Sequence, residues 1–150
     1  MSLLNKRVWQ LAALQESYLQ LKTDLNELSQ VIVWFDGLHQ PQIGKSIWLR
    51  CQLALAEAFT NAVRHAHKNK SAEVPIDIKL TIFDNYLEIR VFDYGIPFNL
   101  EAKLREMPKK EDNISGGGRG LLLMDDIADR LSYTRTEDNR NCLLMVKYYG

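Results

Sequence analysis

Hydrophobic and polar positions follow a helical period through residues 47–68. Apolar side chains recur three or four positions apart, at Ile47, Cys51, Leu55, Ala58 and Ala62. At about 3.6 residues per turn they form one apolar face, which predicts a helix packed against a core. Ser46, directly before the first of them, is the predicted N-cap.

A second helix is predicted from residue 25 to residue 37. Its apolar positions, again at helical spacing, are Leu25, Leu28, Ile32 and Phe35. Asp24 and Glu27 resemble a capping box that opens this helix, and Gly37 would end it. The first 17 residues have a looser amphipathic pattern, from which a short N-terminal helix is expected. A short extended segment is expected around residues 18–21.

Alternation with a period of two predicts two β-hairpins. Residues 76–82 and 87–91 alternate on either side of the turn Asp84-Asn85, and residues 131–136 and 142–149 flank a turn at 137–140. A further helix is expected at 121–127. The stretch 101–115 is charge-rich and contains Pro108. Few of its side chains could fix it in place, so a mobile loop is expected there.

The composition is that of an ordinary soluble globular domain. Of the 150 residues 46% are hydrophobic and 25% are charged, and 19 Lys and Arg balance 19 Asp and Glu. This balance gives no electrostatic reason to expect direct contact with nucleic acid or with a membrane. No apolar run reaches the ~18 residues of a membrane span, and the N-terminus lacks the pattern of a signal peptide. The two cysteines fall in apolar segments, so a cytoplasmic protein with buried thiols is expected.

Three polar side chains interrupt the apolar pattern of residues 47–68. They are spaced four positions apart, at Glu57, Asn61 and His65. This spacing places them on one helix face, with a rotation of about 40° from one to the next. No cation lies three or four positions from Glu57, so a surface ion pair does not account for this carboxylate. Glu57 is therefore a candidate base or metal-site residue. His65 and His67 are two positions apart and unsuited to share a zinc ion.

Two glycine-containing segments are candidate ligand sites. The run Gly116-Gly117-Gly118-Arg119-Gly120 leads into the helix expected at 121–127. Backbone N–H groups and the positive end of a helix dipole suit a phosphate there, although a flexible hinge is the alternative. The spacing matches neither a Walker A loop nor a Rossmann fingerprint. Asp93, at a predicted strand end and followed by Gly95, could by itself be simple turn chemistry.

The order of these segments resembles the ATP-binding fold of histidine kinases and related ATPases, called the Bergerat or GHKL fold. Within that group the chain is most similar to the anti-sigma factor serine/threonine protein kinases. The matching segments are LAEAFTNAVRHA for the N box, VFDYGIPF for the first glycine box and GGGRGLLLM for the second. The resemblance implies a two-layer α/β sandwich in which helices cover one face of a mixed β-sheet. Residues 1–20 would be an N-terminal extension, and residues 21–150 the ATPase domain.

The resemblance also implies roles for individual residues. Glu57 would be the general base, and Asn61 would hold Mg²⁺ with the nucleotide. Asp93 would accept a hydrogen bond from the adenine amino group, and Gly95 would let the base approach. The second glycine box would bind the phosphates through Gly116, Gly118 and Gly120, with Arg119 as a γ-phosphate contact. Similar proteins carry Gly-Thr at the start of the last strand, where this chain aligns Asn141-Cys142.

The implied function is an ATP- and Mg²⁺-dependent protein serine/threonine kinase. It would phosphorylate a serine on an anti-sigma-antagonist partner of the STAS type and sequester a sigma factor, and a homodimer is suggested. An alternative is a nucleotide-sensing module that binds a partner without phosphorylating it. Glu57 favours the kinase, because a pure switch has no use for a base. The catalytic domain of a histidine kinase is disfavoured, since 150 residues leave no room for a helical phosphoacceptor domain.

Overall fold

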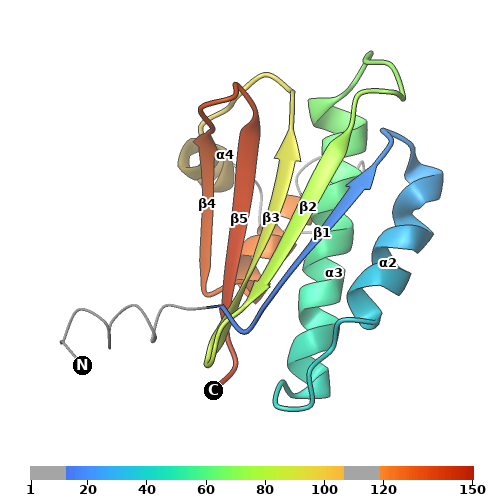
Figure 1. Cartoon of the computed structure of the whole chain (residues 1–150). Helices are drawn as coiled ribbons and strands as arrows, with labels where there is room; N and C mark the ends of the chain where they lie inside the picture. Colours follow the sequence, from blue (N-terminus) through green and yellow to red (C-terminus); the bar gives the residue numbers. More distant parts are fainter. Residues whose placement is uncertain (1–12, 107–118) are drawn as a thin grey trace, which may run out of the picture.

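The computed structural model describes residues 13–106 and 119–150, which form a five-stranded sheet covered by helices on one face (Figure 1). The strands are β1 Gln15–Leu21, β2 Ile76–Ile82, β3 Tyr86–Asp93, β4 Arg130–Arg135 and β5 Asn141–Tyr148. Their order across the sheet is β1-β2-β3-β5-β4. Both predicted hairpins, β2 with β3 and β4 with β5, are confirmed.

The two-layer arrangement is confirmed, but the expectation of a mixed sheet is wrong. Every pairing among the described strands is antiparallel. The connection between β1 and β2 explains why, because the chain descends through one helix and returns through the next (Figure 1). It therefore enters β2 at the end of the sheet where β1 finished, and the two strands run in opposite directions.

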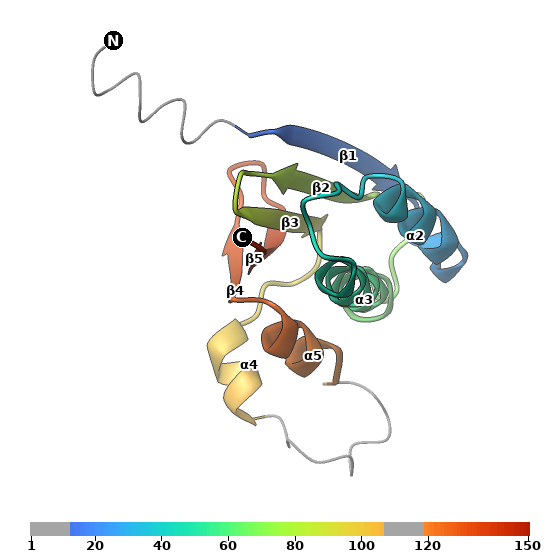
Figure 2. The same cartoon turned by 90° about the horizontal axis from the view of Figure 1, so that it is seen from below.

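Helices α2 Leu28–Asp36, α3 Lys45–Asn61 and α5 Arg119–Ile127 form the covering layer, and the short helix α4 Leu100–Glu106 lies at its β4 end (Figure 2). A 3₁₀ turn at Leu25–Glu27 precedes α2, and a π-helical turn at Ala62–Ala66 continues α3. None of the helices in the described ranges is long and apolar enough to cross a membrane.

The hydrophobic core lies between the sheet and this helical layer. Residues in register across the sheet, such as Leu80, Ile89 and Met145, turn their side chains into it and are almost fully buried. The Phe35 and Trp48 rings stack with their centroids 4.1 Å apart, which joins α2 to α3. Both cysteines are buried free thiols, as predicted.

Helix α3 begins earlier than the apolar pattern indicates. Its first residue is Lys45 and its N-cap is Gly44, so the predicted N-cap Ser46 is wrong. The Trp48 N–H already donates to the Gly44 carbonyl at 3.0 Å, and Ser46 therefore lies inside the first turn. The earlier helix, α2, ends at Asp36 with Gly37 as its C-cap, as predicted.

The start of α2 uses only half of the predicted capping box. The Asp24 carboxylate caps the preceding 3₁₀ turn by accepting from the Asn26 N–H at 2.9 Å. Glu27 does not complete the box, because its carboxylate accepts from the Lys22 N–H instead, at 3.4 Å.

Part of the predicted mobile loop is helical. Helix α4 is opened by Asn99, whose side-chain oxygen accepts from the Ala102 N–H at 3.0 Å. Leu100 is buried and Leu104 packs against the core, so apolar burial offsets the entropy lost on ordering. The rest of that loop, residues 107–115, lies outside the described residues.

The N-terminal helix expected over residues 1–17 lies outside the described residues up to residue 12. Residues 15–17, the end of that prediction, belong to β1, where they pair with residues 80–82 of β2. Alternating exposure along this strand shows an edge strand with one face on the core, consistent with the extended segment expected nearby. Residues of the expected N-terminal extension therefore form one edge of the sheet.

Candidate functional site

Glu57 and Asn61 lie one turn apart on α3, on the side that faces α5. The first turn of α5 packs directly against both side chains. A Cβ atom at Gly120 would lie 3.0 Å from Glu57 Oε2 and 3.1 Å from Asn61 Nδ2. Glycine at this position thus lets the N-terminus of α5 approach closely, and the positive end of its dipole lies beside a carboxylate and an amide oxygen.

Asp93 ends β3 with its side chain buried, at 6% exposure. Its Oδ1 accepts two hydrogen bonds, from the Gly95 N–H at 2.8 Å and from Asn141 Nδ2 at 2.9 Å. Asn141 Nδ2 also donates to the Gly95 carbonyl, at 2.8 Å. Within residues 13–106 and 119–150, Oδ2 accepts no hydrogen bond, so this oxygen is available to a ligand.

The turn at residues 93–95 packs on the π-helical turn that follows α3. A Cβ atom at Gly95 would lie 2.7 Å from the Ala66 carbonyl oxygen and 2.8 Å from Ala66 Cα, so a larger residue would displace backbone. The neighbouring Tyr94 N–H donates to Nε2 of the buried His67, at 2.8 Å. These contacts fix the position of Asp93 relative to α3.

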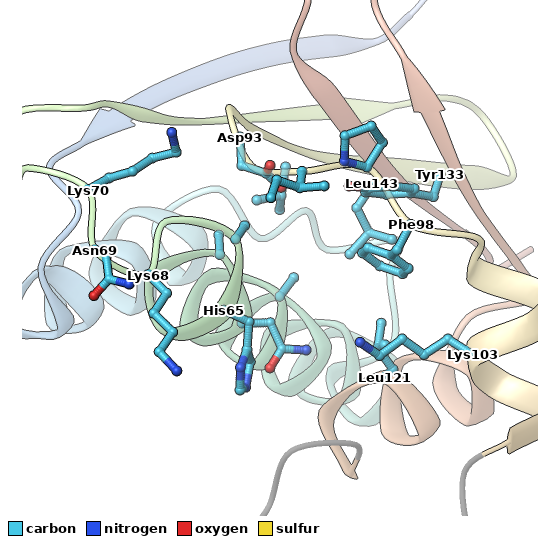
Figure 3. A pocket seen from close by; sticks show the side chains of 17 residues that line it. His65, Lys68, Asn69, Lys70, Asp93, Phe98, Lys103, Leu121, Tyr133 and Leu143 are labelled. Carbon is cyan, nitrogen blue, oxygen red and sulfur yellow. The ribbon is translucent and has the colours of Figure 1, made fainter.

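A cavity of about 540 Å³ opens between α3, β3 and the segment that leads to α4 (Figure 3). Both Asn61 and Asp93 line it. Its size falls within the range typical of small-molecule sites. Apolar and aromatic side chains form much of the wall: Ala58, Ala62, Val91, Ile96, Pro97, Phe98, Leu121, Tyr133 and Leu143. Such a lining suits a planar, partly apolar ring.

The Phe98 and Tyr133 rings stack with their centroids 4.3 Å apart and close one side of the cavity. Burial raises the pKa of Tyr133, and the Asp93 carboxylate adds to this effect. The Tyr133 hydroxyl therefore stays protonated at neutral pH and could donate a hydrogen bond within the cavity.

Three lysines also line the cavity, although the whole chain has no net formal charge. Lys68 and Lys70 lie on one side and Lys103 of α4 on the other (Figure 3). The Lys103 ammonium is 5.2 Å from the centroid of the Phe98 ring. A cationic rim around an apolar pocket with one acidic group favours a ligand that has an aromatic base and an anionic tail.

The structure brings most of the predicted site residues into one region. Asn61 and Asp93 share the cavity, Glu57 lies beside Asn61 at the start of α5, and Arg119 is the exposed first residue of that helix. Glu57 itself is not among the residues that line the cavity. Gly116 and Gly118 lie outside the described residues.

Two residues that hold the Asp93 turn were not found from the sequence, Asn141 and His67. The resemblance places Asn141-Cys142 where similar proteins carry Gly-Thr, and it gives Asn141 no role at the site. In the structure Asn141 stands opposite Asp93, whereas Cys142 stands opposite Phe92 and its side chain points to the other face of the sheet. Asn141 lies beside Asp93 because β5 pairs with β3 in the sheet. In the sequence β4 separates these two strands, so the spacing of residues does not show that they pair.

Comparison with curated proteins identifies related kinases. The chain is 35% identical over 85 residues to the serine-protein kinase RsbW of Bacillus licheniformis, and 32% identical over 102 residues to that of Staphylococcus epidermidis. These alignments cover 53% and 65% of this chain, and 53% and 63% of the two relatives. The chain therefore spans less than two thirds of the length of either.

A solved structure shares the fold. The RsbU and RsbW domains of a Mycobacterium tuberculosis protein match with a TM-score of 0.64 at 13% identity, over 90% of this chain and 32% of that one. Residues 21–147 also match the sequence family described as the histidine kinase-like ATPase domain. This match extends over most of the chain and includes the cavity, α3 and α5. The chain therefore belongs to the family of histidine kinase-like ATPase domains.

Proposed function

We propose that this chain is an ATP-dependent protein serine/threonine kinase that acts as an anti-sigma regulatory factor in the cytoplasm. The observation that carries the proposal is that Asn61 and Asp93 line one cavity, with Glu57 and the N-terminus of α5 directly beside Asn61. The relatives named serine-protein kinases support this assignment.

The residues of the cavity fit an adenine nucleotide. Asp93 Oδ2 accepts from the adenine amino group, because Oδ1 is already engaged by Gly95 and Asn141. The stacked pair Phe98 and Tyr133 provides an apolar surface for the base. The lysines of the rim attract the phosphates, and the dipole at the start of α5 favours them there. The second glycine box binds them further through Gly116, Gly118 and Gly120, with Arg119 at the γ-phosphate.

The donor set also fits Mg²⁺. The amide oxygen of Asn61 is a hard oxygen ligand, and Mg²⁺ commonly combines one or two protein oxygens with phosphates and water. When bound, the ion would neutralise charge on the phosphates. Glu57, one turn away, accepts the proton of the incoming serine hydroxyl as its oxygen bonds to the γ-phosphorus and the bond to ADP breaks.

The partner proposed for this reaction is a small anti-sigma antagonist of the STAS type, and the same protein would sequester a sigma factor as a homodimer. The names of the RsbW relatives support the kinase reaction. The alternative is a nucleotide-sensing module that binds the partner without phosphorylating it. The position of Glu57 beside Asn61 favours the kinase.

The test is a calorimetric titration of ATP with and without Mg²⁺, on the wild type and on Asp93→Asn. The protein is then incubated with ATP and purified STAS-domain proteins from the same cell, and phosphoserine is sought by mass spectrometry. Magnesium-dependent binding that the variant loses, followed by phosphoserine on one partner, supports the kinase. Nucleotide-dependent capture of a partner without phosphoserine supports the alternative, and a wild type that binds no ATP overturns both.

A further inference from the structure

His67 is the most deeply buried titratable side chain near the cavity, at 1% exposure, although its neighbours His65 and Lys68 are exposed. Both ring nitrogens have partners. Nε2 lies 2.8 Å from the Tyr94 backbone nitrogen, and Nδ1 lies 2.8 Å from Thr23 Oγ1. The Thr23 hydroxyl in turn donates to the Val74 carbonyl at 2.5 Å.

This network allows one protonation state. A backbone N–H can only donate, so Nε2 must present its lone pair to Tyr94. The hydroxyl proton of Thr23 is used at Val74, which leaves Thr23 Oγ1 as the acceptor for a proton on Nδ1. His67 is thus neutral and carries its proton on Nδ1, an assignment that follows from the hydrogen-bond partners.

We propose that His67 is a positioning residue for nucleotide binding, and that protonating it weakens the site. It fixes the backbone at Tyr94, between Asp93 and Gly95, and so holds the Asp93 carboxylate at the cavity wall. An added proton on Nε2 would face the Tyr94 N–H, and the two donors would repel each other. This inference rests on the proposed function, since it concerns the same adenine-binding turn.

The surroundings of His67 shift its pKa in opposite directions. Burial lowers the pKa of His67 from its ordinary value of 6.5, the Asp93 carboxylate on β3 opposes this, and Lys70 adds to it. The groups in direct contact, Thr23 and the Tyr94 backbone, are uncharged. Because the pKa of His67 is lowered, the imidazole stays neutral at pH 6.5 and above, and binding weakens only when the pH falls through this lowered pKa.

Two substitutions separate the halves of the network. Glutamine at position 67 can place its amide oxygen near the place of Nε2 and keep an acceptor for Tyr94, with no group to titrate. Asparagine at position 67 is shorter and places its amide near Nδ1, so it keeps Thr23 but leaves the Tyr94 N–H unpaired. His65→Gln is compared only for the pH dependence of binding, because the exposed His65 is the other imidazole that lines the cavity, and its affinity at pH 8 is not used as a reference.

The experiment measures the dissociation constant of Mg-ATP between pH 8 and pH 5.5 for the wild type and the three variants, with folding checked by circular dichroism. At pH 8 we expect His67→Gln to bind as the wild type does and His67→Asn to bind about tenfold more weakly, as for an unpaired buried N–H. Acid should weaken binding by the wild type and by His65→Gln more than by His67→Gln. Equal losses in both His67 variants, or an acid effect that disappears in His65→Gln, would overturn the proposal.

A second measurement needs no nucleotide. Long-range ¹H–¹⁵N NMR spectra at pH 8 report which nitrogen of each imidazole carries the proton. A proton on Nδ1 of His67 is expected, and a proton on Nε2 would overturn the role assigned to it. If the wild type binds no ATP at any pH, the proposed function fails by itself, and the NMR result still decides the hydrogen-bond network.

Discussion

The side-chain amide of Asn141 donates to Oδ1 of Asp93 at 2.9 Å, where β5 and β3 pair residue against residue. The same nitrogen also donates to the Gly95 carbonyl at 2.8 Å. Asn141 Oδ1 accepts from Arg135 Nη1 of β4, at 3.0 Å. One buried amide therefore connects the turn at residues 93–95 to the neighbouring strands β5 and β4.

Asn141→Ala removes a hydrogen-bond donor from Asp93 and another from the Gly95 carbonyl. We expect ATP to bind about tenfold more weakly, because a lost buried hydrogen bond costs about 1–3 kcal/mol. Calorimetry on the folded variant measures this loss. Cys142→Ala is the control, since this side chain lies on the opposite face of the sheet and should leave ATP binding unchanged. Similar losses in the two variants would contradict a specific role for the amide.

Glu57→Ala should reduce phosphoryl transfer by about 10²–10⁴-fold, the loss typical of a missing general base. ATP affinity should stay close to that of the wild type, because Glu57 does not line the cavity. Single-turnover assays with the unphosphorylated partner measure the rate of phosphoryl transfer, and calorimetry measures the affinity for ATP. Glu57→Gln keeps the size of the side chain but not its carboxylate, and should be as slow as the alanine variant. An unchanged rate of phosphoryl transfer in either variant would show that Glu57 is not the general base.

Asn61→Ala should act on binding rather than on the chemical step alone. The variant loses the proposed oxygen ligand of Mg²⁺, so the difference between ATP affinity with and without the ion should shrink. Titrations with and without Mg²⁺ measure this difference directly. Thr60→Ala, at the adjacent position, removes a hydroxyl that bonds the Ala56 carbonyl and should keep the full magnesium effect.

Gly95→Ala should weaken both nucleotide binding and folding. The added methyl carbon would lie within 2.8 Å of Ala66 backbone atoms, closer than such contacts occur, so the turn or the π-helical segment must move. Thermal unfolding should show a loss of about 1–3 kcal/mol in stability. Gly37→Ala is the matched control, because its methyl would meet only ordinary contacts at 3.5 Å and beyond.

Periodicity was sufficient to predict α2, α3, α5 and the two hairpins, but it missed α4 and the first residues of β1. The alternation at Ile76, Ile78 and Leu80 and the helical repeat at Cys51, Leu55 and Ala58 depend on which face is buried, and all six residues are buried. The expectation of a mixed sheet was wrong, because the direction of β2 depends on how α2 and α3 return the chain. Helix α4 was missed because its sequence is rich in charged residues, which favoured a loop, although Leu100 and Leu104 pack against the core.

The proximity of the candidate site residues could be predicted where a motif has a fixed local geometry. Asn61 and Asp93 were found from their segments and share the cavity. Asn141 contacts Asp93 from another strand, and His67 reaches Tyr94 only because the chain changes from an α-helix to a π-helical turn. Sequence spacing alone does not predict either contact. Their roles depend on the pairing of β3 with β5 and on the backbone at Tyr94, both of which are tertiary features.

The π-helical turn at Ala62–Ala66 fixes the number of residues between Asn61 and His67. In a regular α-helix His67 would point about 140° away from Ala62, which is buried, and so toward solvent. The wider turn carries the His67 N–H to the Ala62 carbonyl, at 2.8 Å, and turns the imidazole inward. A single-residue deletion here would regularise the helix and yet move the imidazole off Tyr94. Insertions and deletions between Asn61 and His67 should therefore be selected against even where individual substitutions are tolerated.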